Sequence, residues 1–81
     1  MFVSEHFGQI VRTKRENKRM TLQALAEACD MSIKGIEHIE LGDSDPKLTN
    51  VLKIAKILDI DLGDLNHCVV SKNQSKSDNN T

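Results

Sequence analysis

The segment of residues 21–42 constrains the fold most, because it holds two short helical patterns joined by a turn of about three residues. The first pattern follows Thr21, a residue suited to a helix N-cap, and its apolar positions recur at helical spacing: Leu22, Leu25, Ala26 and Cys29. The second follows Ser32, also a suitable N-cap, and ends at Gly42, which readily adopts the left-handed conformation that closes a helix. Two helices joined so closely cannot lie antiparallel, so we expect them to cross steeply.

Such a pair has the helix-turn-helix geometry, in which the second helix enters the major groove of DNA. Within that helix, expected at residues 32–41, Ile36, Ile39 and Glu40 share one face and should point inward. The other long side chains should point elsewhere: Lys34, Glu37, His38 and Leu41.

Motif positions over residues 7–65 carry a family resemblance in both residue type and spacing: Thr21, Leu25, Ala26, Ser32, Ile36, Ile39, Glu40, Gly42, Pro46, Leu52, Ile54, Ala55, Leu58, Asp61, Leu62 and Leu65. On these residues the chain resembles the phage-repressor type of helix-turn-helix domain, the Cro/CI-like or XRE family. The resemblance implies an all-α fold, a compact five-helix bundle of the lambda-repressor-like type with a central helix-turn-helix. It also implies a sequence-specific regulator of transcription, a repressor, whose partner is double-stranded DNA.

Composition agrees with one small helical domain. The chain has 81 residues, 38% of them apolar, with one Pro and neither Trp nor Tyr, which argues against a β-rich fold. We expect the helix-turn-helix domain to span residues 1–70. Residues 71–81 contain no apolar side chain and cannot offset the entropy of ordering, so they are predicted to form a disordered polar tail.

Several classes of protein are excluded by what the sequence lacks. It has neither the start of a secretory signal nor a segment able to span a bilayer, so we expect a cytoplasmic protein with no membrane partner. Without CxxC spacing the two cysteines should be free thiols, with Cys29 in the core. The histidines are scattered and no nucleophile stands beside a base, so we expect no enzyme activity, metal site or cofactor.

The charge distribution is unusual for a protein that binds DNA. Residues 1–20 carry five basic and two acidic side chains, whereas residues 21–50 carry two basic and six acidic ones. Most non-specific affinity for DNA comes from neutralised phosphates. A domain whose reading helix lies in its acidic third should therefore bind weakly or depend on a few exact contacts.

The resemblance implies base-edge contacts from Ile33, Lys34 and His38, with Glu37 beside them. An exposed isoleucine can meet a thymine methyl group, and a lysine can reach guanine or a phosphate. Glu37 can accept a hydrogen bond from cytosine but repels phosphate. The alternative is structural: Ile33 packs inward and the charged side chains are simply solvated.

Contacts to the DNA backbone are expected from the end of the first helix, from the second helix and from the loop after Gly42. Relatives often carry a glutamine after the capping Thr, where this chain has Leu22, so Gln23 is expected to substitute for it. The other residues expected to contact the backbone are Arg12, Lys14, Lys18, Ser44 and Lys47.

A structural ion pair is also implied by the resemblance, between Arg15 of the first helix and Glu40 at the end of the reading helix. The alternative is two independent surface charges. The first helix is expected over residues 4–17, with Phe7 and Val11 in the core. Arg19 stands where the family often has a glycine, so a strained left-handed turn is expected there.

Towards the end of the domain, Thr49 is expected to cap a fourth helix and Asp61 to open a fifth. The apolar residues that follow either cover the core or form the seam of a homodimer, for which we select Leu65, Cys68, Val69 and Val70. A two-fold dimer would suit a palindromic operator.

A second function remains open on the same fold. The acidic segment of residues 21–50, together with Ile33 and Leu41, could form the surface of a protein-binding module that acts as an accessory or antagonist of another regulator.

Overall fold

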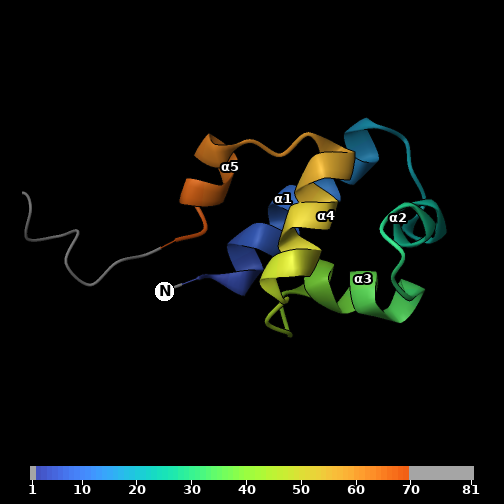
Figure 1. Cartoon of the computed structure of the whole chain (residues 1–81), viewed down its shortest axis with the longest axis horizontal. Coiled ribbons are helices and arrows are strands. Elements are labelled where there is room, and N and C mark those ends of the chain that lie inside the picture. Colours follow the sequence, from blue (N-terminus) through green and yellow to red (C-terminus); the bar gives the residue numbers. More distant parts are fainter. Residues whose placement is uncertain (1, 70–81) are drawn as a thin grey trace, which may run out of the picture.

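Five helices make up the regular structure of residues 2–69, the part of the chain that a computed structural model describes. They are α1 (Ser4–Asn17), α2 (Leu22–Ala28), α3 (Ile33–Leu41), α4 (Leu48–Leu58) and α5 (Leu62–Asn66). In Figure 1, α4 crosses in front of α1, while α2 and α5 lie at opposite ends of the molecule. The predicted all-α fold of five helices is confirmed. None of these helices is long and apolar enough to cross a membrane. The predicted tail, residues 71–81, lies outside the described residues.

The ends of the helix-turn-helix follow local rules. Thr21 Oγ1 accepts a hydrogen bond from the Ala24 N–H at 3.0 Å, and Ser32 Oγ accepts one from the Gly35 N–H at 2.9 Å. Gly42 ends α3 with a φ of 77°, in the left-handed region. All three predicted helix ends are confirmed.

The start of α4 was predicted wrongly. The helix begins at Leu48 and its N-cap is Lys47, which makes no capping hydrogen bond through its side chain. Lys47 is extended, with a ψ of 150°, and its carbonyl already accepts the Val51 N–H at 2.9 Å. Thr49 therefore lies inside the first turn and does not cap it.

The core consists of buried apolar side chains from α1, α2, α3 and α4 and from the residues flanking them and α5, and Leu65 of α5 packs against it partly buried. Phe7 and Val11 are fully buried, as predicted, and Cys29 is 2% exposed. Cys68, which we had selected for a dimer seam, is also fully buried, so that selection was wrong. The start of the chain lies beside Cys68. The Val3 N–H donates to the Cys68 carbonyl at 2.6 Å, and Phe2 and Val69 form an isolated antiparallel bridge.

Helices α1 and α3 approach each other backbone to backbone. A Cβ atom at Gly8 would overlap the Ile39 carbonyl oxygen and lie 2.7 Å from that of Glu40, so only glycine fits there. Likewise, a Cβ at Gly42 would lie 2.8 Å from Glu5 Cα. Close packing of this kind leaves no volume for relative movement, so α1 fixes the position of α3.

Among residues 2–69, three non-glycine residues have positive φ. Arg19 and Asp59 each have a φ of 58°, which confirms the left-handed turn expected at Arg19. The third, Asp30, has a φ of 55° in the turn between α2 and α3. Aspartate tolerates the left-handed conformation better than most residues. At Arg19 the same conformation strains the backbone locally.

Candidate nucleic-acid interface

The outward side of α3 presents the side chains expected to contact bases. Lys34, Glu37 and His38 are exposed, and Ile33 is 46% exposed, so it does not pack inward. Leu41 continues this surface at the end of the helix and is 65% exposed. Ile36 and Ile39 point the other way into the core. We call the outward surface formed by Ile33, Lys34, Glu37, His38 and Leu41 the reading face.

A two-pronged ion pair holds α3 from behind. Arg15 Nε donates to Glu40 Oε2 at 2.6 Å and Arg15 Nη2 donates to Glu40 Oε1 at 3.2 Å, while Nη1 donates to the Met20 carbonyl at 2.8 Å. Both side chains are largely buried, Arg15 at 13% and Glu40 at 8% exposed. The hydrogen bond with Glu40 raises the pKa of Arg15 above its ordinary value, against the opposing effect of burial. The geometry is that of the predicted structural pair rather than of two independent charges.

His38 is oriented by the loop after α3. Its Nδ1 lies 2.9 Å from Asp43 Oδ1, and the two side chains are about half exposed. In the sequence, Asp43 counted only as one of the six acidic side chains of residues 21–50, and its pairing with His38 was missed. The available signal was Gly42, because a left-handed residue at a helix end turns the following residue back over the last helical turn.

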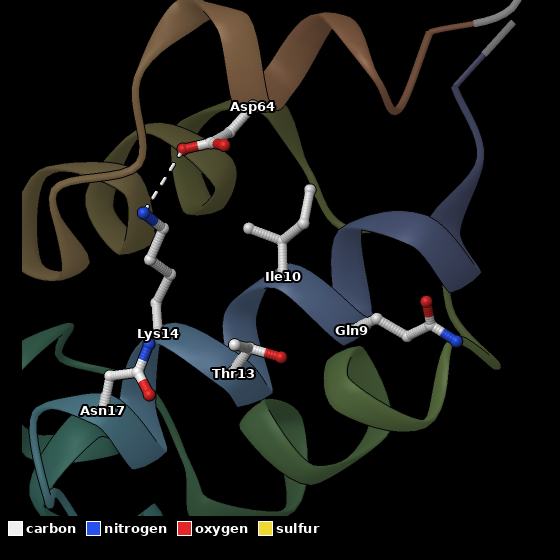
Figure 2. A pocket seen from close by; sticks show the side chains of 6 residues that line it. All are labelled: Gln9, Ile10, Thr13, Lys14, Asn17 and Asp64. Atoms are coloured by element: carbon white, nitrogen blue, oxygen red, sulfur yellow. Dashed lines mark ion pairs between the residues drawn. The ribbon is translucent and has the colours of Figure 1, made fainter.

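Two of the lysines expected to contact the DNA backbone are occupied elsewhere. Lys14 Nζ lies 3.5 Å from Asp64 Oδ2, and Lys18 Nζ lies 3.0 Å from Asp59 Oδ2. Figure 2 shows Lys14 pointing from α1 towards Asp64 on α5. The structure therefore does not bring Lys14 and Lys18 together with the reading face.

The remaining predicted backbone contacts lie at the surface. Arg12 borders the same hollow as Glu37 and Leu41, and it also pairs with Glu16 one turn along α1 at 3.3 Å. Gln23 is exposed on α2 and donates to Glu27 at 3.3 Å. In the loop after α3, Ser44 and Lys47 are exposed too.

A comparison of the chain with families of known proteins decides its identity. The helix-turn-helix family matches residues 11–65, which include the second half of α1, the whole of α2, α3 and α4, and all but the last residue of α5. The chain belongs to the helix-turn-helix family of the Cro/CI (XRE) type. This family's domain binds DNA and is typically non-catalytic. A search of curated protein sequences gives no match.

The helix-turn-helix domain also contains titratable groups away from its reading face. Asp64 accepts a hydrogen bond from the Asp61 N–H, which lowers the pKa of its carboxyl, and the nearby Lys14 lowers it further. Burial raises the pKa values of the Cys29 and Cys68 thiols. Within residues 2–69 no cluster of three or more side chains suited to a metal ion is found.

Proposed function

We propose that this helix-turn-helix protein is a sequence-specific transcriptional repressor that reads the major groove with α3. The observation that carries the proposal is the reading face. It exposes four side chains able to contact base edges, on a helix whose position is fixed from its inner side: Ile33, Lys34, Glu37 and His38. Arg15 and Glu40 provide that fixation, and the Gly8 contact adds to it. A rigid helix suits specific reading, since base contacts depend on exact placement.

For phosphate contacts we propose Lys34 and Lys47 as the main cations, supported by Arg12, Gln23 and Ser44. Neither Lys34 nor Lys47 takes part in any ion pair found among residues 2–69. Lys14 and Lys18 could join them only by leaving Asp64 and Asp59. The loop carboxylates near α3 oppose phosphate, so affinity should rest on few cations.

We further propose a homodimer on a palindromic operator, because two weak half-sites bound together give useful affinity. The seam consists of apolar side chains from α5 and the residues after it. Val69 is 48% exposed, Leu62 is 77% exposed and Leu65 is half-buried. Cys68 is excluded by its burial, and Val70 lies outside the described residues.

Selection of bound fragments from a random duplex pool tests the function, followed by titration of the winning duplex at several salt concentrations. With Lys34 and Lys47 on phosphates in each protomer, a dimer should give a slope of log affinity against log salt near −4, from about −0.9 per phosphate, and a phosphate contact from Arg12 would steepen it to about −5. Lys34→Ala should weaken binding and make this slope shallower by roughly 2 in the dimer. Lys14→Ala is the matched control and should leave the slope unchanged.

A second function is favoured by one specific observation, the exposure of Leu41 and Ile33 beside Glu37 and Asp43. An apolar and acidic surface of this kind fits a basic, apolar segment of another protein. If the duplex pool yields no enriched sequence and binding is undetectable at low salt, the DNA proposal fails and the protein-binding module takes its place.

A further inference from the structure

The backbone at the end of α3 places one carboxylate against one imidazole. The Gly42 N–H donates to the Ile39 carbonyl at 3.1 Å, and the Asp43 N–H donates to the His38 carbonyl at 3.3 Å. This pair of bonds is the Schellman motif, which depends on the left-handed conformation of Gly42. It returns Asp43 over the last turn of α3, so its contact with His38 follows from the backbone rather than from chance surface pairing.

The contact determines which nitrogen of His38 carries a hydrogen. An ionised carboxylate only accepts hydrogen bonds, so at 2.9 Å from Asp43 Oδ1 the Nδ1 atom of His38 must be the donor. In a neutral imidazole the other nitrogen, Nε2, then has no hydrogen and can only accept. When the ring is protonated, Nε2 also becomes a donor.

We propose that Asp43 is a positioning residue that fixes the tautomer of His38 and thereby selects the base that His38 reads. This inference rests on the proposed function. A neutral His38, whose Nε2 can only accept, should favour a base with an amino donor in the major groove, which is the N4 group of cytosine or the N6 group of adenine. It should disfavour guanine, whose major-groove edge presents only the acceptors N7 and O6.

Protonation of His38 should change this preference. The charged groups nearest along the chain are Lys34, Glu37 and Glu40 on α3, with Asp43 in the loop, and Glu40 is paired with Arg15. Only Asp43 is bonded to the ring among residues 2–69. Because the protonated ring donates from Nε2, guanine should gain relative to cytosine once the ring is protonated.

The first test is NMR of the imidazole nitrogens in the full chain without DNA, at a pH where His38 is neutral. Correlations from ring protons to both nitrogens identify the tautomer, and loss of the signals in His38→Gln assigns them. We expect the Nδ1–H form for His38 and a mixture of forms in Asp43→Ala. His6 is an internal control, because its Nδ1 lies 3.3 Å from the His67 carbonyl oxygen and should not respond. An Nε2–H form in the parent protein overturns the proposal, whatever the protein does with DNA.

The second test measures affinity for the selected duplex and for versions in which each base pair of a half-site is reversed, C·G to G·C or A·T to T·A. One position should favour the amino-bearing base by about tenfold at high pH, a typical size for one base contact. Asp43→Ala should largely abolish that preference. Asp45→Ala is the matched control, since it removes the same charge from the same loop, whereas the Asp45 carboxylate accepts a hydrogen bond from the Ser4 hydroxyl at 2.6 Å.

The two tests separate the two ideas. If the tautomer is as expected and specific DNA binding is found, but Asp43→Ala keeps the full base preference, the selection of the base by Asp43 is wrong while the proposed function stands. If no DNA is bound at all, the proposed function and the base-reading role fall together, and the NMR result then describes only the geometry of the loop.

Discussion

The Arg15–Glu40 pair allows a sharp test of how α3 is held in place. Arg15→Ala would leave the Glu40 carboxylate, which is 8% exposed, without its partner and would also strip the Met20 carbonyl of its donor. Removing one member of a buried pair costs about 3–5 kcal/mol. Because the pair lies near the surface, we expect a loss at the lower end, about 3 kcal/mol.

The opposite substitution should cost less. Glu40→Ala leaves the Arg15 guanidinium bonded to the Met20 carbonyl, with Glu16 Oε2 at 4.0 Å from Nη2 as a second neighbour. We expect about 2 kcal/mol. The double variant should cost less than the sum of the two single variants, by about 1–2 kcal/mol, since only the first removal strands a charge.

Denaturant unfolding followed by circular dichroism measures these losses, and thermal melting provides a check. A loss of 1 kcal/mol lowers the melting temperature of a domain this small by about 4–8 °C. Arg12→Ala is the matched control, because the Arg12–Glu16 pair is more than half exposed on both sides and should be worth about 0.5 kcal/mol or less. Additive single losses, or an Arg15→Ala loss no larger than that of Arg12→Ala, would refute the reasoning.

Two further predictions concern the C-terminal part of the domain. Val69→Ser should shift a concentration-dependent dimer towards monomer in sedimentation without lowering the melting temperature of the monomer, and a parent protein that is monomeric at all concentrations would contradict the seam. Asp64 has a lowered pKa in the folded state, chiefly through the Asp61 N–H, so its contribution to stability is complete above the ordinary aspartate pKa and is lost as the pH falls through the lowered value. The free energy of unfolding should therefore change less with pH below about pH 5 in Asp64→Asn than in the parent protein, and the difference in stability between the two should shrink at more acid pH. The same pH dependence in both proteins would count against this role.

Helix ends could be predicted because they depend on neighbours in the sequence. Thr21, Ser32 and Gly42 satisfy or terminate backbone hydrogen bonds within a few residues, and the structure confirms all three. The prediction that Thr49 caps α4 was wrong, although the true cap is also determined locally. The extended residue after Pro46 starts the helix early, and a preference for Thr at a cap does not reveal which residue becomes extended.

The surface of α1 could not be predicted, because it depends on which face α5 covers. Lys14 and Lys18 look like free cations in the sequence, and their partners Asp64 and Asp59 come from the far end of the domain. The family resemblance correctly gave the Arg15 pairing, since that contact belongs to the shared fold. It could not give the Lys14–Asp64 and Lys18–Asp59 pairs, because the fold does not require them.

The split of α3 into two sides has a consequence for how such a protein can change. The side chains that hold the helix, Ile36, Ile39 and Glu40, are all turned inward, and none belongs to the reading face. Substitutions at Ile33, Glu37 or His38 should therefore alter what is recognised while leaving the stability of the domain nearly intact. New specificities are within reach of single substitutions, because the residues that choose a target are separate from those that maintain the fold.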